Sequence, residues 1–472
     1  MTTVVTVFLR HDGEVLLCRS ADTERWDALS RVVGEDERSR VGGEDERSRV
    51  GGEGERSRVG PESGFRSEAV EVVTERTELS ADDTEQLSLV RRGEPIRLTD
   101  SRTVVPFLFD CERRAAVTPS RDTPAKTTTE AVEWTTPTAI RERAATLGLW
   151  DAYRAVAPSV ETVAADDTHG SASISVRALE VVRDTAAVAD DWETVATRAA
   201  ALCDARPEMA AVQNRVDRVL ADSDHQPDAV HDRAVSAIER AVAADERAAE
   251  RAAELIDGPV LTLSRSGTVR ATLSRTTGRV YVAESRPGEE GRSVAAALAE
   301  TRPVTLLPDA AVAAVLAERP VDTVLVGADT IHPDGRVRNK VGTRTAVAAA
   351  AEADVPVCVV TARDKVAPGF TDGEASSRGV TDATADGEAS SRGVTDAAAD
   401  GEVSSSRQSA FETPLGCDAF APTFDTTPVS APVVTVVTED GPVETDGVAA
   451  VAAEHARNAA WRRGDSPDGG RE

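Results

Sequence analysis

The chain is short of basic residues, and of lysine above all, which excludes two classes of partner. Its 54 basic residues face 82 acidic ones, and the net charge at pH 7 is −28. A surface this acidic repels the phosphates of nucleic acids and of anionic lipids, so we expect neither nucleic acid nor membrane as a partner. Acidic, lysine-poor chains are typical of cytoplasms kept at high salt, which predicts a cytoplasmic, halophilic protein.

Paired cysteines and long apolar runs are missing as well. The five cysteines lie far apart without a Cys-x-x-Cys pair, which predicts neither a disulfide framework nor a zinc site. Aromatic residues make up 3% of the chain, so its core must be built from Val, Ala and Leu. The N-terminal segment MTTVVTVFLR reaches a charge too early for a signal peptide or a membrane span.

Two repeats interrupt the chain. A nine-residue unit, GEDERSRVG, recurs over residues 34–60, and a fourteen-residue unit, DGEASSRGVTDATA, sets the period of residues 372–407. Neither unit has the apolar spacing needed to bury a face, so we expect disordered inserts inside loops. The 472 residues suffice for about three domains of ~150 residues. We predict these domains at 1–155, 160–256 and 257–460.

The pattern of apolar residues changes along the chain. Residues 3–10 and 14–19 alternate around an Asp-Gly turn, which predicts a β-hairpin. A short helix is expected over about 136–156, and periods of three and four predict several helices between 172 and 256. After Gly258, short Val- and Leu-rich runs alternate with helical segments, which is typical of a parallel sheet covered on both faces. These runs are VLTLS, RVYVAES, VTLLP, TVLVGAD and VPVCVVTA.

The residues that follow these runs have the chemistry of an anion site. Ligands of parallel sheets bind beyond the carboxyl ends of the strands. Hydroxyls and glycines let backbone amides approach an anion, and cations neutralise it. Two of the three lysines, Lys340 and Lys365, lie here, while the third is Lys126. The pattern predicts a site for a phosphorylated small molecule, with candidate residues Ser264, Ser266, Gly267, Arg286, Asp329, Asn339, Lys340 and Lys365.

Ordered motifs from about residue 165 to 460 resemble the initiation factor two-B alpha/beta/delta subunit family. These motifs are HGSA from His169, ARP from Ala205, SRPGEEG from Ser285, GADTI from Gly327, NKVGT from Asn339, RDKVAP from Arg363 and APTFDTTP from Ala421. The family includes methylthioribose-1-phosphate and ribose-1,5-bisphosphate isomerases. The resemblance implies a helical subdomain, a Rossmann-like parallel-sheet subdomain and assembly into homo-oligomers.

The resemblance also implies roles for individual residues. In the family's isomerases a cysteine and an aspartate move a proton between C1 and C2 of the sugar, and the aspartate matches Asp329. The cysteine falls at Ser264, whose hydroxyl is a poor base without a strong partner. The implied ligand-binding residues are Gly170, Ser171, Ala172, Arg206, Asn339, Lys340 and Lys365.

The first ~155 residues resemble a Nudix domain, an α+β fold that binds Mg²⁺ through several glutamates on one helix. The support is the HDGEVLLCRS hairpin, Trp26-Asp27, the strand VVPFLF and the closing TTPTAIRERAATLGLWDAY. In the segment that matches best, EVVTERTEL from Glu71, only Glu75 of the box glutamates is kept. One carboxylate beside an arginine holds Mg²⁺ poorly. We therefore expect a degenerate docking or binding domain, with Mg²⁺ at Glu75 as the weaker alternative and no cofactor in the C-terminal domain.

The sequence thus predicts an α/β protein with a Nudix-like domain before an initiation-factor-two-B-like region. We expect a regulatory or assembly protein that binds a phosphorylated sugar or nucleotide, such as a ribose phosphate or nucleoside monophosphate. The first alternative is a sugar-phosphate isomerase like ribose-1,5-bisphosphate isomerase, which is favoured if the residue at position 264 supports turnover. The second alternative is a Nudix pyrophosphatase acting through the N-terminal domain.

Overall fold

The computed structural model describes residues 2–33, 62–79, 87–117, 129–221, 223–369, 420–428 and 433–463. Both repeats and Lys126 lie outside the described residues. The chain forms two compact units. Unit 1 comprises Met1–Ser159, Val176–Val195 and Pro227–Glu239, and unit 2 comprises Val160–Ser175, Ala196–Gln226 and Arg240–Glu472. The domain limits proposed from the sequence stay predictions.

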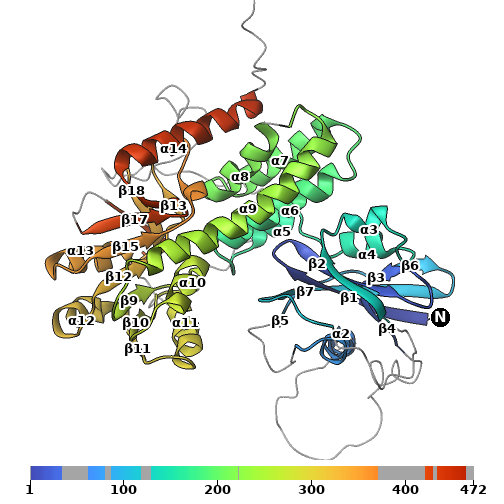
Figure 1. Ribbon diagram of the computed structural model, residues 1–472, viewed down its shortest axis with the longest axis horizontal. Helices are drawn as coiled ribbons and strands as arrows, with labels where there is room; N and C mark the ends of the chain where they lie inside the picture. Colours follow the sequence, from blue (N-terminus) through green and yellow to red (C-terminus); the bar gives the residue numbers. More distant parts are fainter. Residues whose placement is uncertain are drawn as a thin grey trace, which may run out of the picture. The chain divides into compact units, whose positions relative to one another are not determined.

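Unit 1 is built on a mixed eight-stranded sheet in which β3, β2, β1, β7 and β5 are successive neighbours (Figure 1). The predicted hairpin is confirmed, because β1 and β2 pair antiparallel around Asp12 and Gly13, whose φ angles are 48° and 80°. Strands β1 and β7 run parallel at the centre. The strands are β1 (Thr2–His11), β2 (Glu14–Ser20), β3 (Trp26–Asp27), β4 (Leu29–Val33), β5 (Leu87–Arg92), β6 (Ile96–Thr99), β7 (Arg102–Cys111) and β8 (Thr129–Thr135).

Helices cover both faces of this sheet. Apolar residues of α2 (Glu62–Arg76) pack on one face, and those of α3 (Ala139–Glu142) and α4 (Leu149–Arg154) pack on the other. The single helix predicted over 136–156 is wrong in extent. Gly148, with a φ of 75°, precedes α4 in a left-handed conformation that interrupts a helix and that glycine tolerates.

Buried charges join the second half of helix α6 (Ser171–Ala186) to the sheet of unit 1. The Arg10 guanidinium donates to Asp110 at 2.6 Å and to Glu180 at 2.8 Å. Arg183 donates to the carbonyl oxygen of Gly13 at 2.6 Å. Both arginines are buried, and a buried guanidinium is tolerated only when such partners satisfy it. This network explains why the part of α6 from Val176 onward belongs to unit 1.

The helices predicted between 172 and 256 are present. They are α6, α7 (Trp192–Ala205), α8 (Ala210–Ala221) and α9 (Pro227–Ala253), and the short α5 (Val160–Ala165) precedes them. None of the helices in the described parts of the chain is both long enough and apolar enough to span a membrane.

Unit 2 contains the predicted parallel sheet, in the order β11-β10-β9-β12-β15-β17-β18. All of these strands pair in parallel except β18, which pairs antiparallel with β17. All five runs predicted as strands are confirmed. The strands are β9 (Val260–Leu263), β10 (Val280–Ala283), β11 (Val304–Leu307), β12 (Thr323–Val326), β15 (Val357–Val360), β17 (Val434–Thr438) and β18 (Gly441–Val443).

Both faces of this sheet are covered, which explains its continuous apolar strands. One apolar cluster joins the sheet to α12 (Val312–Glu318), α13 (Thr343–Glu352) and α14 (Thr445–Asn458). The other joins it to α10 (Gly267–Arg275), α11 (Glu290–Ala299) and the end of α9. Figure 1 shows α10 and α11 on one side of the strands, with α12 and α13 on the other.

A small antiparallel sheet in unit 2 carries one of the motifs. It consists of β13 (Thr330–Ile331), β14 (Val337–Lys340) and β16 (Phe424–Thr427), in that order. β14 ends at Lys340, and Asn339 and Lys340 pair with Asp425 and Phe424 of β16. Asp329, directly before β13, donates its backbone N–H to the carbonyl oxygen of Arg338 at 3.0 Å.

Candidate functional site

The pairing register brings the candidate segments to one edge of the parallel sheet. Leu263 of β9 pairs with Ala283 of β10, which pairs with Leu307 of β11. On the other side, Val326 of β12 pairs with Val359 of β15. The segments that follow these strands therefore emerge at a common carboxyl edge, where α/β sheets bind ligands. They begin at Ser264, Glu284, Pro308, Gly327 and Thr361.

Two serines turn the chain sharply at this edge. Ser264 and Ser285 have φ angles of 63° and 65°, in the left-handed region that residues other than glycine seldom occupy. The N–H of Ser264 donates to Oγ of Ser285 at 2.6 Å. The Asp309 carboxylate accepts from the N–H groups of Ser285 at 2.8 Å and of Arg286 at 2.6 Å. These bonds hold strained turns that are typical of ligand sites.

Glycines leave the backbone accessible next to these turns. Ser266 caps α10 by accepting from the N–H of Val269 at 3.4 Å, and Gly267 begins that helix. A Cβ added at Gly267 or at Gly170 would meet no atom within 4 Å. A ligand can therefore approach either backbone closely, as the sequence predicts for both residues.

Asp329 is held at the end of β12 by the start of helix α6. The Ser171 hydroxyl donates to Oδ1 of Asp329 at 3.2 Å. Ser171 is buried and Asp329 is half-buried, so this carboxylate is oriented and still partly open to solvent. Two residues that the sequence predicts for one site, Ser171 and Asp329, are thus in direct contact across 158 positions of the chain.

Lys365 binds the backbone directly before Asp329. Its Nζ donates to the carbonyl oxygen of Ala328 at 2.8 Å, and the residue is 4% exposed. A buried ammonium normally requires strong partners or a bound anion. The solvated surface position that a lysine usually takes is therefore excluded for Lys365.

Lys340 is also turned into the protein, and its partner is an acidic residue. Its Nζ lies 2.5 Å from Oε1 of Glu290 in α11, and its side chain is 12% exposed. The neighbouring Asn339 is buried and donates through Nδ2 to Oγ1 of Thr343 at 2.9 Å. Asp425 of β16 accepts from the N–H of Gly342 at 2.8 Å and so secures the same loop.

A buried ion network anchors the segment that carries Lys365. The Asp364 carboxylate accepts from Nε of Arg215 at 3.0 Å and from Nη2 of Arg218 at 2.5 Å. Asn214 donates to the carbonyl oxygens of Asp364 at 2.8 Å and Val366 at 2.7 Å. Helix α8 thereby fixes both the side chain and the backbone of the RDKV segment.

The charge states in this network follow from its geometry. Burial disfavours ionised Asp364, but Arg215 and Arg218 together outweigh burial and hold the pKa of this carboxyl well below its ordinary value. Burial also lowers the pKa of His455 in α14. His455 donates through Nδ1 to the carbonyl oxygen of Val366 at 2.8 Å, and its Nε2 accepts from Arg218 at 3.4 Å. A neutral imidazole therefore joins the C-terminal helix to the same segment.

Two of the predicted ligand-binding arginines have other contacts. The guanidinium of Arg206 donates to the carbonyl oxygens of Val163 at 3.0 Å and Asp166 at 2.5 Å, which stabilises the turn before Gly170. Arg286 is exposed and pairs with Glu284 at 3.2 Å and Glu289 at 2.6 Å. The carbonyl oxygen of Ala172, a third predicted ligand-binding residue, accepts hydrogen bonds from the Ser175 hydroxyl and from Arg215.

No thiol takes the place of Ser264 among the described residues. Cys203 lies in α7, Cys358 lies within β15, and both are buried. Burial raises the pKa of Cys358 to about 12, which removes it further from the range of a base at neutral pH. The remaining described cysteines, Cys18 and Cys111, belong to strands of unit 1.

Sequence reasoning missed the acidic residues that organise this edge. Asp309, Glu290 and Asp364 form contacts across 24 to 149 positions, which local periodicity does not reveal. Glu290 and Asp364 do lie inside the motifs SRPGEEG and RDKVAP, so their positions are a usable signal. The residues that they contact, such as Lys340 and Arg215, cannot be read from these motifs.

The candidate metal residue of unit 1, Glu75, is engaged by an arginine. Arg31 donates to both carboxylate oxygens of Glu75 at 2.8 and 2.7 Å, to Glu71 at 2.5 Å and to Glu68 at 3.3 Å. The guanidinium thus supplies the positive charge among these three carboxylates. Within the described ranges, no group of three or more His, Cys, Asp and Glu side chains is arranged for a metal.

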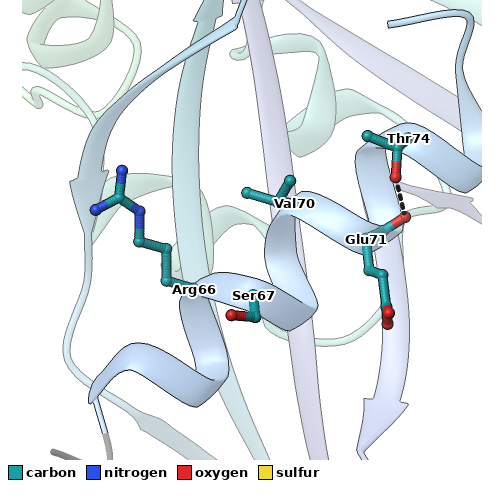
Figure 2. A pocket seen from close by; sticks show the side chains of 5 residues that line it. All are labelled: Arg66, Ser67, Val70, Glu71 and Thr74. Atoms are coloured by element: carbon teal, nitrogen blue, oxygen red, sulfur yellow. Dashed lines mark hydrogen bonds between the residues drawn. The ribbon is translucent and has the colours of Figure 1, made fainter. Parts of the chain in front are cut away.

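An open depression of about 310 Å³ lies along helix α2. Figure 2 shows the side chains that line it, and the Thr74 hydroxyl donates to the carbonyl oxygen of Glu71 at 3.2 Å. With Arg66 as the one cation in its lining, the depression has little of the chemistry found at the sheet edge of unit 2. The lining residues are Arg66, Ser67, Val70, Glu71 and Thr74.

The fold and the polar residues at the carboxyl edge of the sheet together define the class of protein. It is an α/β protein with a polar candidate site at the carboxyl ends of parallel strands. A model of the initiation factor 2 subunit family matches residues 167–445, more than half of the chain. The chain therefore belongs to this family. The resemblance of the N-terminal region to a Nudix domain stays a prediction.

Similar proteins include isomerases. Methylthioribose-1-phosphate isomerase of Trypanosoma brucei brucei is 30% identical over 164 residues, which cover 34% of this chain and 42% of that protein. Ribose 1,5-bisphosphate isomerase of Haloferax volcanii is 41% identical over 93 residues, which cover 20% of this chain and 28% of that one. Both matches thus span less than half of the relative's length. The structure of translation initiation factor eIF-2B from Pyrococcus horikoshii OT3 is 22% identical, covers 60% of this chain and 94% of that one, and has a TM-score of 0.47.

The Asp364 network yields a prediction about stability. Asp364→Asn removes one of the two carboxylates that pair with the buried Arg215, so we expect the free energy of unfolding to fall by about 3 kcal/mol. The measurement is chemical denaturation. Asp100→Asn is the matched control, because the Arg97–Asp100 pair is exposed and should contribute less than about 0.5 kcal/mol. Equal losses in the two variants would contradict the role given to the network.

Proposed function

We propose that unit 2 binds a phosphorylated sugar at the carboxyl edge of its parallel sheet and interconverts its aldose and ketose forms. The observation that carries the proposal is the contact of Lys365 with the backbone directly before Asp329. Lys365 binds the carbonyl oxygen of Ala328, the residue before Asp329, while Ser171 orients the carboxylate. Relatives named as isomerases of phosphorylated sugars support the same chemistry.

The reaction needs no redox partner. For ribose 1,5-bisphosphate, hydrogen moves from C2 to C1, the bond between C1 and the ring oxygen breaks, and the proton of the 2-hydroxyl passes to that oxygen. The product, ribulose 1,5-bisphosphate, has the same atoms. We assign proton transfer to Asp329, because a positioned carboxylate can act as acid and base. Lys340 and Lys365 neutralise phosphate charge, and the exposed backbone at Gly267 and Gly170 admits the sugar.

Ser264 favours a second candidate function. The family resemblance places a cysteine at this position, and a serine hydroxyl is a far weaker acid than a thiol and so is seldom available as a base. A chain that keeps the binding residues without this base would act as a regulatory or assembly protein that senses a sugar phosphate or nucleotide. Assembly into homo-oligomers stays a prediction under either function.

A Nudix pyrophosphatase activity of unit 1 has less support. Such chemistry needs carboxylates free to bind Mg²⁺. Glu75 already accepts two hydrogen bonds from Arg31, which also pairs with Glu71 and Glu68. We therefore propose that the N-terminal region serves binding or docking.

Turnover separates the two candidate functions. We expect the protein to convert ribose 1,5-bisphosphate to ribulose 1,5-bisphosphate slowly. The conversion is measured by ³¹P NMR. Ser264→Cys should raise the rate, because a thiol pKa of about 8.5 lies closer to neutrality. Asp329→Asn should lower it by about 10²- to 10⁴-fold, since a positioned acid–base group contributes that much. Absence of turnover in both the wild type and Ser264→Cys would reject the isomerase and leave the sensing function.

Binding tests the two lysines independently of turnover. Lys340→Met and Lys365→Met keep the apolar stem and remove the charge, so each should weaken ribose 1,5-bisphosphate binding about tenfold or more, or about 1.4 kcal/mol. Isothermal titration calorimetry measures this loss. Arg97→Met, at an exposed position of unit 1, is the control for a lost positive charge. Unchanged affinity in both lysine variants would remove the site.

A further inference from the structure

His169 lies in the segment that enters helix α6, and contacts on both sides of it place this segment at the carboxyl edge of the sheet. The carbonyl oxygen of Thr168 accepts a hydrogen bond from the guanidinium of Arg265, which belongs to the segment after β9. Two residues further along, the Ser171 hydroxyl donates to Asp329 at 3.2 Å. His169 is therefore held between the segment after β9 and the proposed acid–base carboxylate.

The space beside this histidine is open. The side chain of His169 is 40% exposed, and a Cβ added at the neighbouring Gly170 would meet no atom within 4 Å. Successive Cα atoms are only about 3.8 Å apart, so the imidazole and the bare backbone of Gly170 border the same opening. A small molecule that contacts Asp329 beside Ser171 can therefore also reach His169.

A carboxylate orients the imidazole. Oδ1 of Asp166 accepts from Nδ1 of His169 at 2.9 Å and from the backbone N–H groups of Thr168 at 3.2 Å and His169 at 3.1 Å. A carboxylate only accepts, so Nδ1 carries the hydrogen, and Nε2 of the neutral ring has the lone pair of a base. The Asp166 side chain is 7% exposed, so water screens its attraction to a protonated ring only weakly.

The turn itself does not require an imidazole. Asp166 already binds the two backbone N–H groups of this turn, so a side chain without a ring nitrogen at position 169 would leave these two bonds in place. An imidazole is the side chain best suited to take up and release a proton near neutral pH. The proposed reaction needs such a group at the sugar carbons, because the Ser264 hydroxyl is a poor base.

We propose that His169 is a catalytic residue that carries the proton from C2 to C1 of the sugar phosphate, and that Asp166 is its positioning residue. The inference rests on the proposed function. Nε2 takes the proton from C2, the electron pair of that bond forms the C1–C2 double bond, and the bond from C1 to the ring oxygen breaks. Asp329 passes the proton of the 2-hydroxyl to the ring oxygen. The carbonyl then forms at C2 while C1 takes the proton from His169, so atoms and electrons balance without a co-reactant.

Steady-state kinetics of the full chain with ribose 1,5-bisphosphate tests the role of His169. We expect His169→Ala to lower kcat by about 10²- to 10⁴-fold and to change KM little, because the imidazole moves a proton rather than binding the substrate. Imidazole added to the solution should restore at least a tenfold part of this loss, which it would not do for a residue with only a structural role. His225→Ala, at an exposed position between α8 and α9, is the control and should keep the wild-type kcat with and without added imidazole.

A double-variant comparison tests the positioning role of Asp166. Asp166→Asn keeps an oxygen that accepts from the turn and removes the negative charge, so we expect a lower kcat. Combined with His169→Ala it should cause no further loss, because the carboxylate acts only through the imidazole. Losses that multiply would show that Asp166 acts independently of the histidine and would overturn this part of the inference.

The outcomes separate this inference from the function on which it rests. Wild-type turnover that is unchanged in His169→Ala would overturn the inference and leave the proposed isomerase standing. A loss in His169→Ala that added imidazole does not restore would assign the residue to the structure of the loop and would also overturn the inference alone. A wild type without turnover would overturn the proposed reaction together with it.

Discussion

The carboxylate of Asp364 lies buried between Arg215 and Arg218 of helix α8, and the candidate site depends on this contact. Removing Asp364 would leave two arginines without a shared counter-charge, one of them the buried Arg215, so the arrangement is strongly specified. It fixes the segment after β15, in which Lys365 reaches the carbonyl oxygen before Asp329. Helix α8 and the parallel sheet thus hold one end of the site rigidly, as acid–base chemistry requires.

A second set of contacts, made by Asp309 and Glu290, holds the other side of this carboxyl edge in place. Carboxylates there hold backbone turns and a lysine: Asp309 binds two successive N–H groups, and Glu290 pairs with Lys340. A chain with a net charge of −28 therefore uses individual acidic residues as structural anchors inside the site that we propose for a sugar phosphate. Their negative charge must be compensated locally, which explains why each lies beside N–H donors or a cation.

Much of this arrangement was predictable from the sequence. Short Val-rich runs such as β12 and β15 identify buried parallel strands, and parallel strands bring Ser264, Asp329 and Lys365 to one edge. The scarcity of lysine singled out Lys340 and Lys365, and both are largely buried. Contacts between distant residues were not predictable, because the Asp364–Arg215 pair leaves no trace in local periodicity. The break between α3 and α4 was missed because it begins at Arg143, whose extended backbone ends α3 without a glycine or proline to signal it.

The function proposed for unit 2 requires that a sugar phosphate bind at the carboxyl edge of its sheet. Amide hydrogen exchange followed by mass spectrometry, with and without ribose 1,5-bisphosphate, tests it most directly in the full chain. We expect slower exchange on ligand addition in residues 264–268, 285–291 and 363–366, because ligand binding suppresses local opening. Slower exchange confined to residues 2–33 or 62–79 of unit 1, with none at these three segments, would contradict it.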